Sequence, residues 1–118
     1  MTDNKALGAR GEELAAQYLQ ATGWTIVGRN WRCRFGELDL IAQDSTVTAF
    51  VEVKTRRGLG FGRPEESVTF GKRRRIRQLA LLWLHEQDGP YRQVRFDVIS
   101  VLLLPGEQPV VEHLEAVF

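Results

Sequence analysis

Two stretches of the chain show the period of an amphipathic helix. Over residues 5–22 and 70–87, apolar side chains recur every three or four positions, which places them on one face of a helix. In the first stretch these residues are Leu7, Gly11, Leu14, Ala15 and Tyr18. In the second they are Ile76, Leu79, Ala80, Trp83 and Leu84. The pattern therefore predicts two helices, each with one face turned towards a core.

The remaining hydrophobic pattern has the two-residue period of β-strands. It predicts strands at residues 24–31, 37–43, 48–54, 94–104 and 109–118. The short connection after residue 43 indicates a hairpin in which Gln43 lies opposite Thr48. The resulting order is αβββαββ, and 118 residues suit one domain with one core. We therefore expect an α/β fold in which helices pack on a sheet.

The predicted strand at 48–54 carries opposite charges on one face. Glu52 and Lys54 point the same way because alternate strand residues share a face. In the predicted hairpin register, Asp39 lies opposite Glu52, and Glu37 lies opposite Lys54. Opposed carboxylates destabilise a sheet unless a proton or a cation lies between them. Such oxygens suit a hard ion, Mg²⁺ or Mn²⁺; the alternative is a Glu37–Lys54 salt bridge on a solvated face.

The residue type at position 54 adds a chemical argument. The chain contains thirteen Arg but only three Lys, and one of these follows Glu52 by two positions. A desolvated Lys can lose its proton and act as a base, whereas Arg stays charged. An amine beside a metal-activated water is a combination suited to phosphodiester hydrolysis.

Positive charge is concentrated in the middle of the chain. The net charge is only +1, but residues 52–77 contain nine Lys and Arg against three Glu, an excess of six, so the remainder carries −5. This asymmetry favours an anionic partner. We expect nucleic-acid phosphates to bind the basic side chains, although a solvated basic face is the alternative. These side chains are Arg56, Arg57, Arg63, Lys72, Arg73, Arg74, Arg75 and Arg77.

Other features exclude several classes of protein. Cys33 is the only cysteine, so no internal disulfide forms, and two scattered histidines are too few for a zinc site. No apolar run is long enough to span a membrane and the N-terminus has no signal-peptide pattern, so we expect a cytoplasmic protein without a membrane partner.

Asp97 interrupts an apolar strand, and we expect it to pair with an Arg.

Four segments together resemble a known family. The stretches GARGEELAAQYLQATGW, NWRCRFGELDLIAQD and FVEVKTRR, with Lys72, are similar to the YraN-like family of small bacterial proteins, which are described as predicted endonucleases. The order of Glu12, Asp39, Glu52 and Lys54 resembles the PD-(D/E)xK pattern of type II restriction enzymes and archaeal Holliday junction resolvases. The resemblance covers nearly the whole chain. One mild departure is a leucine directly before the aspartate, where the superfamily has a proline that is not a ligand.

The resemblance implies a fold, a metal and roles for individual residues. The fold would be a restriction endonuclease-like core, a central mixed sheet flanked by helices in a single nuclease-like domain, 1–118. The implied ligands of Mg²⁺ or Mn²⁺ are Asp39, Glu52, Glu12 and the carbonyl of Val53. Lys54 would orient or deprotonate the attacking water. Glu37 would support the site by pairing with Lys54 or an Arg.

The implied substrate is nucleic acid, with DNA favoured and branched or structured DNA as a specific expectation. A homodimer would suit an enzyme that cuts two strands. Two alternatives stand beside the nuclease: a non-catalytic nucleic-acid-binding module, and an adaptor whose acidic remainder docks a protein.

Overall fold

The computed structural model describes residues 4–58, 68–89 and 92–118. Along the chain it contains α1 (Asn4–Ala21), β1 (Thr25–Cys33), β2 (Gly36–Gln43), β3 (Val47–Arg56), α2 (Phe70–His85), β4 (Gln93–Leu102) and β5 (Val110–Leu114). The predicted order αβββαββ is confirmed. The last strand is shorter than the predicted 109–118, because the chain turns after Leu114 and Ala116 adopts a left-handed φ of 53°.

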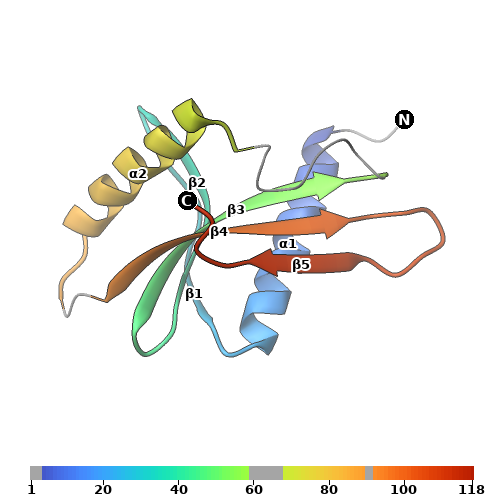
Figure 1. Ribbon diagram of the computed structural model, residues 1–118, viewed down its shortest axis with the longest axis horizontal. Helices are drawn as coiled ribbons and strands as arrows, with labels where there is room; N and C mark the ends of the chain where they lie inside the picture. Colours follow the sequence, from blue (N-terminus) through green and yellow to red (C-terminus); the bar gives the residue numbers. More distant parts are fainter. Residues whose placement is uncertain (1–3, 59–67, 90–91) are drawn as a thin grey trace.

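The strands form one mixed sheet in the order β1-β2-β3-β4-β5 (Figure 1). Neighbouring strands are antiparallel except β3 and β4, which are parallel and are connected through α2. The predicted hairpin register is confirmed, since Gln43 lies opposite Thr48. The fold is thus the expected α/β arrangement, a mixed central sheet with two helices, and it is compatible with a restriction endonuclease-like core.

The two helices pack on opposite faces of the sheet. Alternate residues of β3 point to opposite sides, and the buried Val51 belongs to the cluster under α1 whereas the buried Phe50 belongs to the cluster under α2. The α1 cluster includes Ala15, Ala16 and Leu19. The α2 cluster includes Ile76, Leu79, Ala80 and Trp83, as the helical pattern predicted. In the part of the chain that the structure describes, neither helix is long and apolar enough to cross a membrane.

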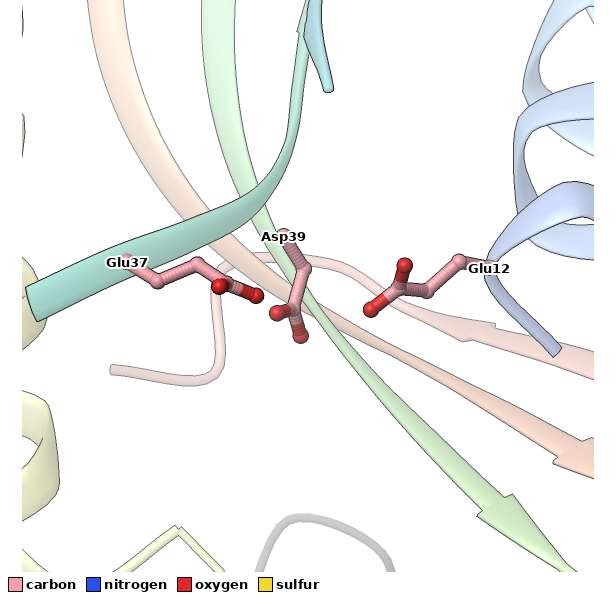
Figure 2. A group of neighbouring side chains, drawn as sticks. All are labelled: Glu12, Glu37 and Asp39. Atoms are coloured by element: carbon pink, nitrogen blue, oxygen red, sulfur yellow. The ribbon is translucent and has the colours of Figure 1, made fainter. Parts of the chain in front are cut away.

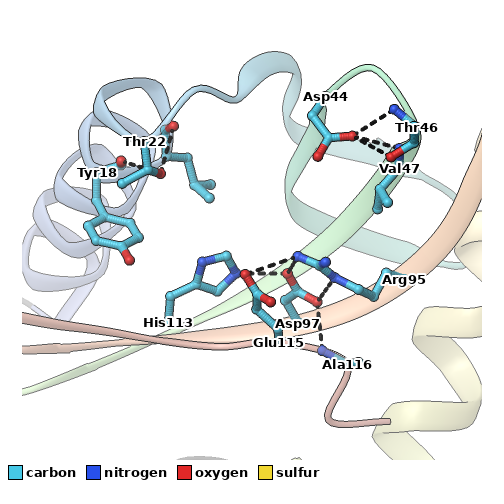
Figure 3. Close-up of polar contacts among 11 residues, drawn as sticks. Tyr18, Thr22, Asp44, Thr46, Val47, Arg95, Asp97, His113, Glu115 and Ala116 are labelled. Atoms are coloured by element: carbon cyan, nitrogen blue, oxygen red, sulfur yellow. Dashed lines mark hydrogen bonds and ion pairs between the residues drawn. The ribbon is translucent and has the colours of Figure 1, made fainter.

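A buried aspartate ties the end of the chain to β4. Asp97 accepts two hydrogen bonds of 2.9 Å from the Arg95 guanidinium and one of 2.9 Å from the Ala116 backbone N–H, and its Oδ2 lies 2.7 Å from His113 Nε2 (Figure 3). Burial by itself would raise the pKa of Asp97, but the bonds from His113, Arg95 and Ala116 together lower it. The predicted pairing with an Arg is confirmed.

Candidate active site

The site lies where the β2–β3 hairpin opens. The backbone pairing of these strands runs from Gln43–Thr48 to Leu40–Val51. One step further, the Val53 N–H donates to Asp39 Oδ2 at 3.0 Å. The other edge of β3 stays paired with β4 as far as residue 56, so β3 remains part of the sheet beside the opening. A carboxylate has therefore replaced a backbone carbonyl as the hydrogen-bond partner of β3.

Three carboxylates from two elements converge at this opening. Glu12 comes from α1, and Glu37 and Asp39 come from β2; one oxygen from each lies within 4.8 Å of the other two. Figure 2 shows Glu12 and Glu37 on either side of Asp39, with all three carboxylates turned towards one another. The structure therefore joins two predicted ligands, Glu12 and Asp39, with Glu37, for which the family resemblance implied only a supporting role.

Glu12 reaches the sheet because α1 approaches β3 very closely beside it. Gly11 is buried, and a Cβ added there would collide with the side chain of Thr55 on β3. Only glycine permits this approach without moving the helix or the strand. The neighbouring Glu13 turns outwards, where it forms an ion pair of 2.8 Å with Arg29.

Asn30 is a site residue that the sequence analysis missed. It lies in β1 with a left-handed φ of 49°, a conformation that Asn tolerates better than most residues. Its side chain is hydrogen-bonded to the Glu12 carboxylate, which it helps to orient. The hydrophobic pattern could not have predicted the contact between Asn30 and Glu12, because a polar residue in an edge strand is expected to face solvent.

The carboxylates repel one another in a partly buried setting. Burial, followed by the charge of Glu52, raises the pKa of Asp39 to about 7. A hydrogen bond from the Asp39 carboxyl to Glu52 adds to this effect. The pKa of Glu12 is also raised, first by burial and then by the charges of Glu37 and Glu52, against the opposing bond from Asn30. A proton or a cation between these groups would relieve the repulsion, and an all-carboxylate donor set fits a hard divalent ion.

Glu52 is engaged with two lysines. Its side chain is only 11% exposed, and its Oε1 lies 3.0 Å from Lys72 Nζ and 3.7 Å from Lys54 Nζ. Lys72 lies in the first turn of α2, where its backbone N–H donates to the N-cap residue Thr69 at 3.2 Å. The predicted ligand Glu52 thus lies beside Asp39, but it is held by an ammonium group from α2.

The two lysines have opposite pKa shifts. Burial, then the hydrogen bond and charge of Lys72, lower the pKa of Lys54. Burial would also lower the pKa of Lys72, but its hydrogen bond to Lys54 and the charge of Glu52 raise it instead. Lys72 is therefore the charged donor of the pair, and Lys54 is the amine that loses its proton more readily.

The structure also decides between the two partners that the sequence allowed for Glu37. Glu37 Oε2 lies 2.6 Å from Arg32 Nε, across the β1–β2 ladder in which these two residues are paired. Among the ion pairs of the described residues, Lys54 pairs with Glu52 rather than with Glu37. The cross-strand Glu37–Lys54 bridge, which was the alternative to a site, is wrong.

A cleft of about 260 Å³ lies between the hairpin opening and the first half of α2. Carboxylates and cations face each other across it, with apolar side chains from the core at its base. Its lining residues are Gly36, Glu37, Asp39, Glu52, Lys72, Arg75, Ile76 and Leu79. Gly36 is required at its edge, since it has a φ of 147° and a Cβ there would lie 3.2 Å from Leu79.

The eight basic side chains predicted to bind nucleic acid differ in their surroundings. Some contact other parts of the fold, and others line the cleft or are exposed. Arg73 donates to the Val68 carbonyl at 2.8 Å, and Arg77 lies over the Phe96 ring at 5.7 Å. Lys72 and Arg75 line the cleft itself. Three further members lie on the described surface or near it: Arg56 half-buried, and Arg57 and Arg74 exposed. Arg63 lies outside the described residues.

Known proteins similar to this chain cover its whole length. The uncharacterised protein family UPF0102 matches residues 11–101. A UPF0102 protein of Nocardia farcinica is 71% identical over 116 residues, which are 98% of this chain and 91% of the relative. A UPF0102 protein of Rhodococcus opacus is 54% identical over all of both chains. A third, from Acidothermus cellulolyticus, is 49% identical over 97% of this chain and 94% of the relative.

Proposed function

We propose that this chain, which belongs to the uncharacterised protein family UPF0102, is a metal-dependent nuclease that hydrolyses phosphodiester bonds in nucleic acid. One observation carries the proposal. Carboxylates from α1 and β2 converge within 4.8 Å of one another, and those of β2 line a cleft together with Glu52 and Lys72. Lys54 lies beside this cleft, 3.7 Å from Glu52. The similarity to the PD-(D/E)xK pattern supports membership of that nuclease superfamily.

The residues that would hold the ion are Glu12, Glu37 and Asp39. Their oxygens lie close enough together to share one cation, and Mg²⁺ and Mn²⁺ prefer such oxygens. Glu52 is hydrogen-bonded to Asp39 and would become a further ligand once it leaves Lys72. The Val53 carbonyl is available as an additional oxygen on this edge of β3, because the N–H and C=O of one strand residue face the same neighbour.

A divalent cation at this position supplies positive charge that stabilises a phosphate oxygen and acidifies a water. The chain supplies the rest of the chemistry. Lys54, whose pKa is lowered by burial, can accept a hydrogen bond from the attacking water and take its proton. Lys72 and Arg75, on the opposite wall of the cleft, are placed to bind phosphates on either side of the bond that is cut.

The decisive experiment measures cleavage by the purified chain. Linear, flapped and four-way-junction DNA and structured RNA are incubated with Mg²⁺, Mn²⁺ or chelator. We expect cleavage of DNA that needs the metal and is strongest on branched substrates. Lys54→Ala should lower the cleavage rate at least about a hundredfold, the usual contribution of a general base, while substrate binding survives.

A matched pair of variants tests the metal ligands. Glu12→Gln should abolish cleavage, whereas Glu13→Gln, one residue further along α1 and paired outwards with Arg29, should leave it unchanged. Equal activity of both variants would exclude Glu12 from the site. Cleavage that persists in all of the variants would point to a contaminating enzyme and would remove the support for this proposal.

A non-catalytic nucleic-acid-binding module is the second candidate, and the engagement of Glu52 with Lys54 and Lys72 favours it. In that case the chain would bind nucleic acid in a salt-dependent way, without cleavage under any metal. Binding that is equally tight in chelator and in Mg²⁺, with no product, would identify this function and overturn the nuclease.

A further inference from the structure

The turn between β1 and β2 presents an aromatic ring beside the cleft. Phe35, at the tip of this turn, is 57% exposed, and the next two residues, Gly36 and Glu37, line the cleft. The Phe35 backbone N–H donates to Cys33 Sγ at 3.4 Å, and Gly36 packs against α2, so the turn is held next to the helix (Figure 1). Since a strand rises about 3.4 Å per residue, the ring is anchored within about 7 Å of the backbone of Glu37.

A hollow of about 780 Å³ lies between this turn and α2, next to the cleft. Arg75 and Leu79 line both the hollow and the cleft, so a molecule that occupies the cleft can extend directly into the hollow. Sites that enclose a small organic molecule have volumes of about 300–1,000 Å³, and a nucleoside therefore fits here. The remaining lining residues are Arg34, Phe35, Gln78, Leu81, Leu82 and His85.

The chemistry of this lining selects the occupant. The Phe35 ring and the leucines suit a flat, weakly hydrated ring, and Gln78 and His85 can hydrogen-bond its edges. Arg34 and Arg75 carry positive charge, and no carboxylate is among the described residues that line the hollow. Such a rim attracts phosphate. An unpaired nucleotide combines a flat base with a phosphate, and aromatic rings beside cations are the platforms on which such bases stack.

Arg34 and Phe35 already form one half of such a platform. The guanidinium carbon of Arg34 lies over the Phe35 ring, 4.7 Å from its centroid. This cation–π contact covers one face of the ring and places a positive charge beside it. A base on the other face would be stacked on the ring, with its phosphate near the guanidinium.

We propose that this hollow binds an unpaired base of the substrate, stacked on Phe35, next to the phosphodiester in the cleft. A paired base is stacked on its neighbours inside the duplex and must leave the stack before it can enter such a pocket. The preferred substrate is then DNA with a single-stranded segment at the cleavage point, such as a flap, rather than a four-way junction with fully paired arms. The inference rests on the proposed function, because it takes nucleic acid as the occupant of the cleft, but its test measures binding and needs no cleavage.

Fluorescence anisotropy in chelator tests the proposal, with a labelled duplex that carries a short single-stranded flap and the same duplex without the flap. We expect the full chain to bind the flapped probe more tightly. Phe35→Leu keeps an apolar side chain but loses the ring. It should weaken binding of the flapped probe about tenfold or more, the loss expected for one stacked base, and leave binding of the paired probe unchanged. Phe35→Trp keeps a flat ring and should bind the flapped probe as tightly as the parent chain.

Val110→Ala is the matched control. Val110 is 56% exposed on β5, three strands away from β2 in the sheet, so both affinities should stay the same. Thermal unfolding shows that each variant is folded. Equal affinity of the parent for the two probes, no binding of either, or full affinity of Phe35→Leu for the flapped probe would overturn the inference. An equal loss on both probes would also overturn it, because Phe35 would then contact the duplex.

The nuclease proposal fails on a different result. A preference for the flapped probe that depends on Phe35, without product in Mg²⁺ or Mn²⁺, would retain the base site and remove the catalysis. Metal-dependent cleavage without that preference would retain the nuclease and remove the base site.

Discussion

Replacing Asp39 with Asn is expected to stabilise the folded chain in the presence of a chelator. Asn has nearly the same shape, and its carbonyl oxygen can still accept the Val53 N–H that now binds Asp39 Oδ2 at 3.0 Å. Its amide N–H can donate to Glu52, as the protonated Asp39 carboxyl does. The substitution therefore removes a negative charge and leaves the hydrogen bonds in place.

The size of the effect follows from the raised pKa of Asp39. In the folded chain the pKa is about 7 instead of 3.8, because of burial and the neighbouring Glu52. This difference corresponds to a cost of about 4 kcal/mol for the ionised folded state. The folded chain binds more protons than the unfolded chain between these two values, so its stability falls as the pH rises from near 4 towards about 7. Above that range the whole cost is present.

Denaturant unfolding in chelator, at a series of pH values, measures this effect. The gain in unfolding free energy from Asp39→Asn should be largest above about pH 7, approach about 4 kcal/mol, and shrink steadily as the pH falls towards 4. Adding Mg²⁺ should stabilise the parent chain and not the variant, since only the parent retains the carboxylate. A variant that is less stable at all pH values, or a gain that does not change with pH, would refute the argument.

Asp44, at the other end of the same hairpin, provides a control of opposite sign. Its carboxylate accepts hydrogen bonds from the backbone N–H groups of Thr46 and Val47, which lower the pKa of Asp44 (Figure 3). Asp44→Asn should therefore destabilise the chain at neutral pH. This loss should fade as the pH falls through the acid range, where the parent carboxylate is also protonated.

Four further substitutions, at three positions, test contacts of the site and of the core, and denaturant unfolding measures the stability of each variant. Gly11→Ala should lower the unfolding free energy by about 1–3 kcal/mol, because the new methyl group collides with the Thr55 side chain. Unchanged stability would contradict the close approach of α1 to β3. Asn30→Gly keeps the left-handed backbone and loses only the bond to Glu12, so it should weaken Mn²⁺ binding in calorimetry with little loss of stability. Asn30→Ala should weaken Mn²⁺ binding to the same extent, and it should also lower the unfolding free energy by about 1–2 kcal/mol, because alanine is strained at a left-handed φ. If Asn30→Gly and Asn30→Ala were equally stable, that strain would be absent. Asp97→Asn leaves the half-buried Arg95 guanidinium without its carboxylate, so it should lower the unfolding free energy by about 3–5 kcal/mol at neutral pH and by less in acid. A loss below about 1 kcal/mol would contradict that role.

The sequence by itself determined the elements and the faces of the strands. Hydrophobic period is a local property, so it identified both helices, the buried residues of α2 and the common face of Glu52 and Lys54. For α1 the predicted stripe included Ala15 but not the equally buried Ala16 and Leu19. The hairpin register followed from the short turn, and it brought Asp39 beside Glu52. The resemblance to the PD-(D/E)xK pattern then indicated Glu12 as a third carboxylate. The hydrophobic pattern alone could not have shown that Glu12, in a helix, lies beside Asp39 in β2.

The tertiary structure alone decided which groups meet. Glu37 lies with Glu12 and Asp39 where the β2–β3 hairpin opens, beyond Leu40. The alternation of polar and apolar residues along a strand does not show where two strands separate. Contacts of Lys72 with Glu52 and of Asn30 with Glu12 depend on how α2, α1 and β1 pack. Packing is fixed by side chains distant in sequence, at Gly11 against β3 for example, and that information is not local.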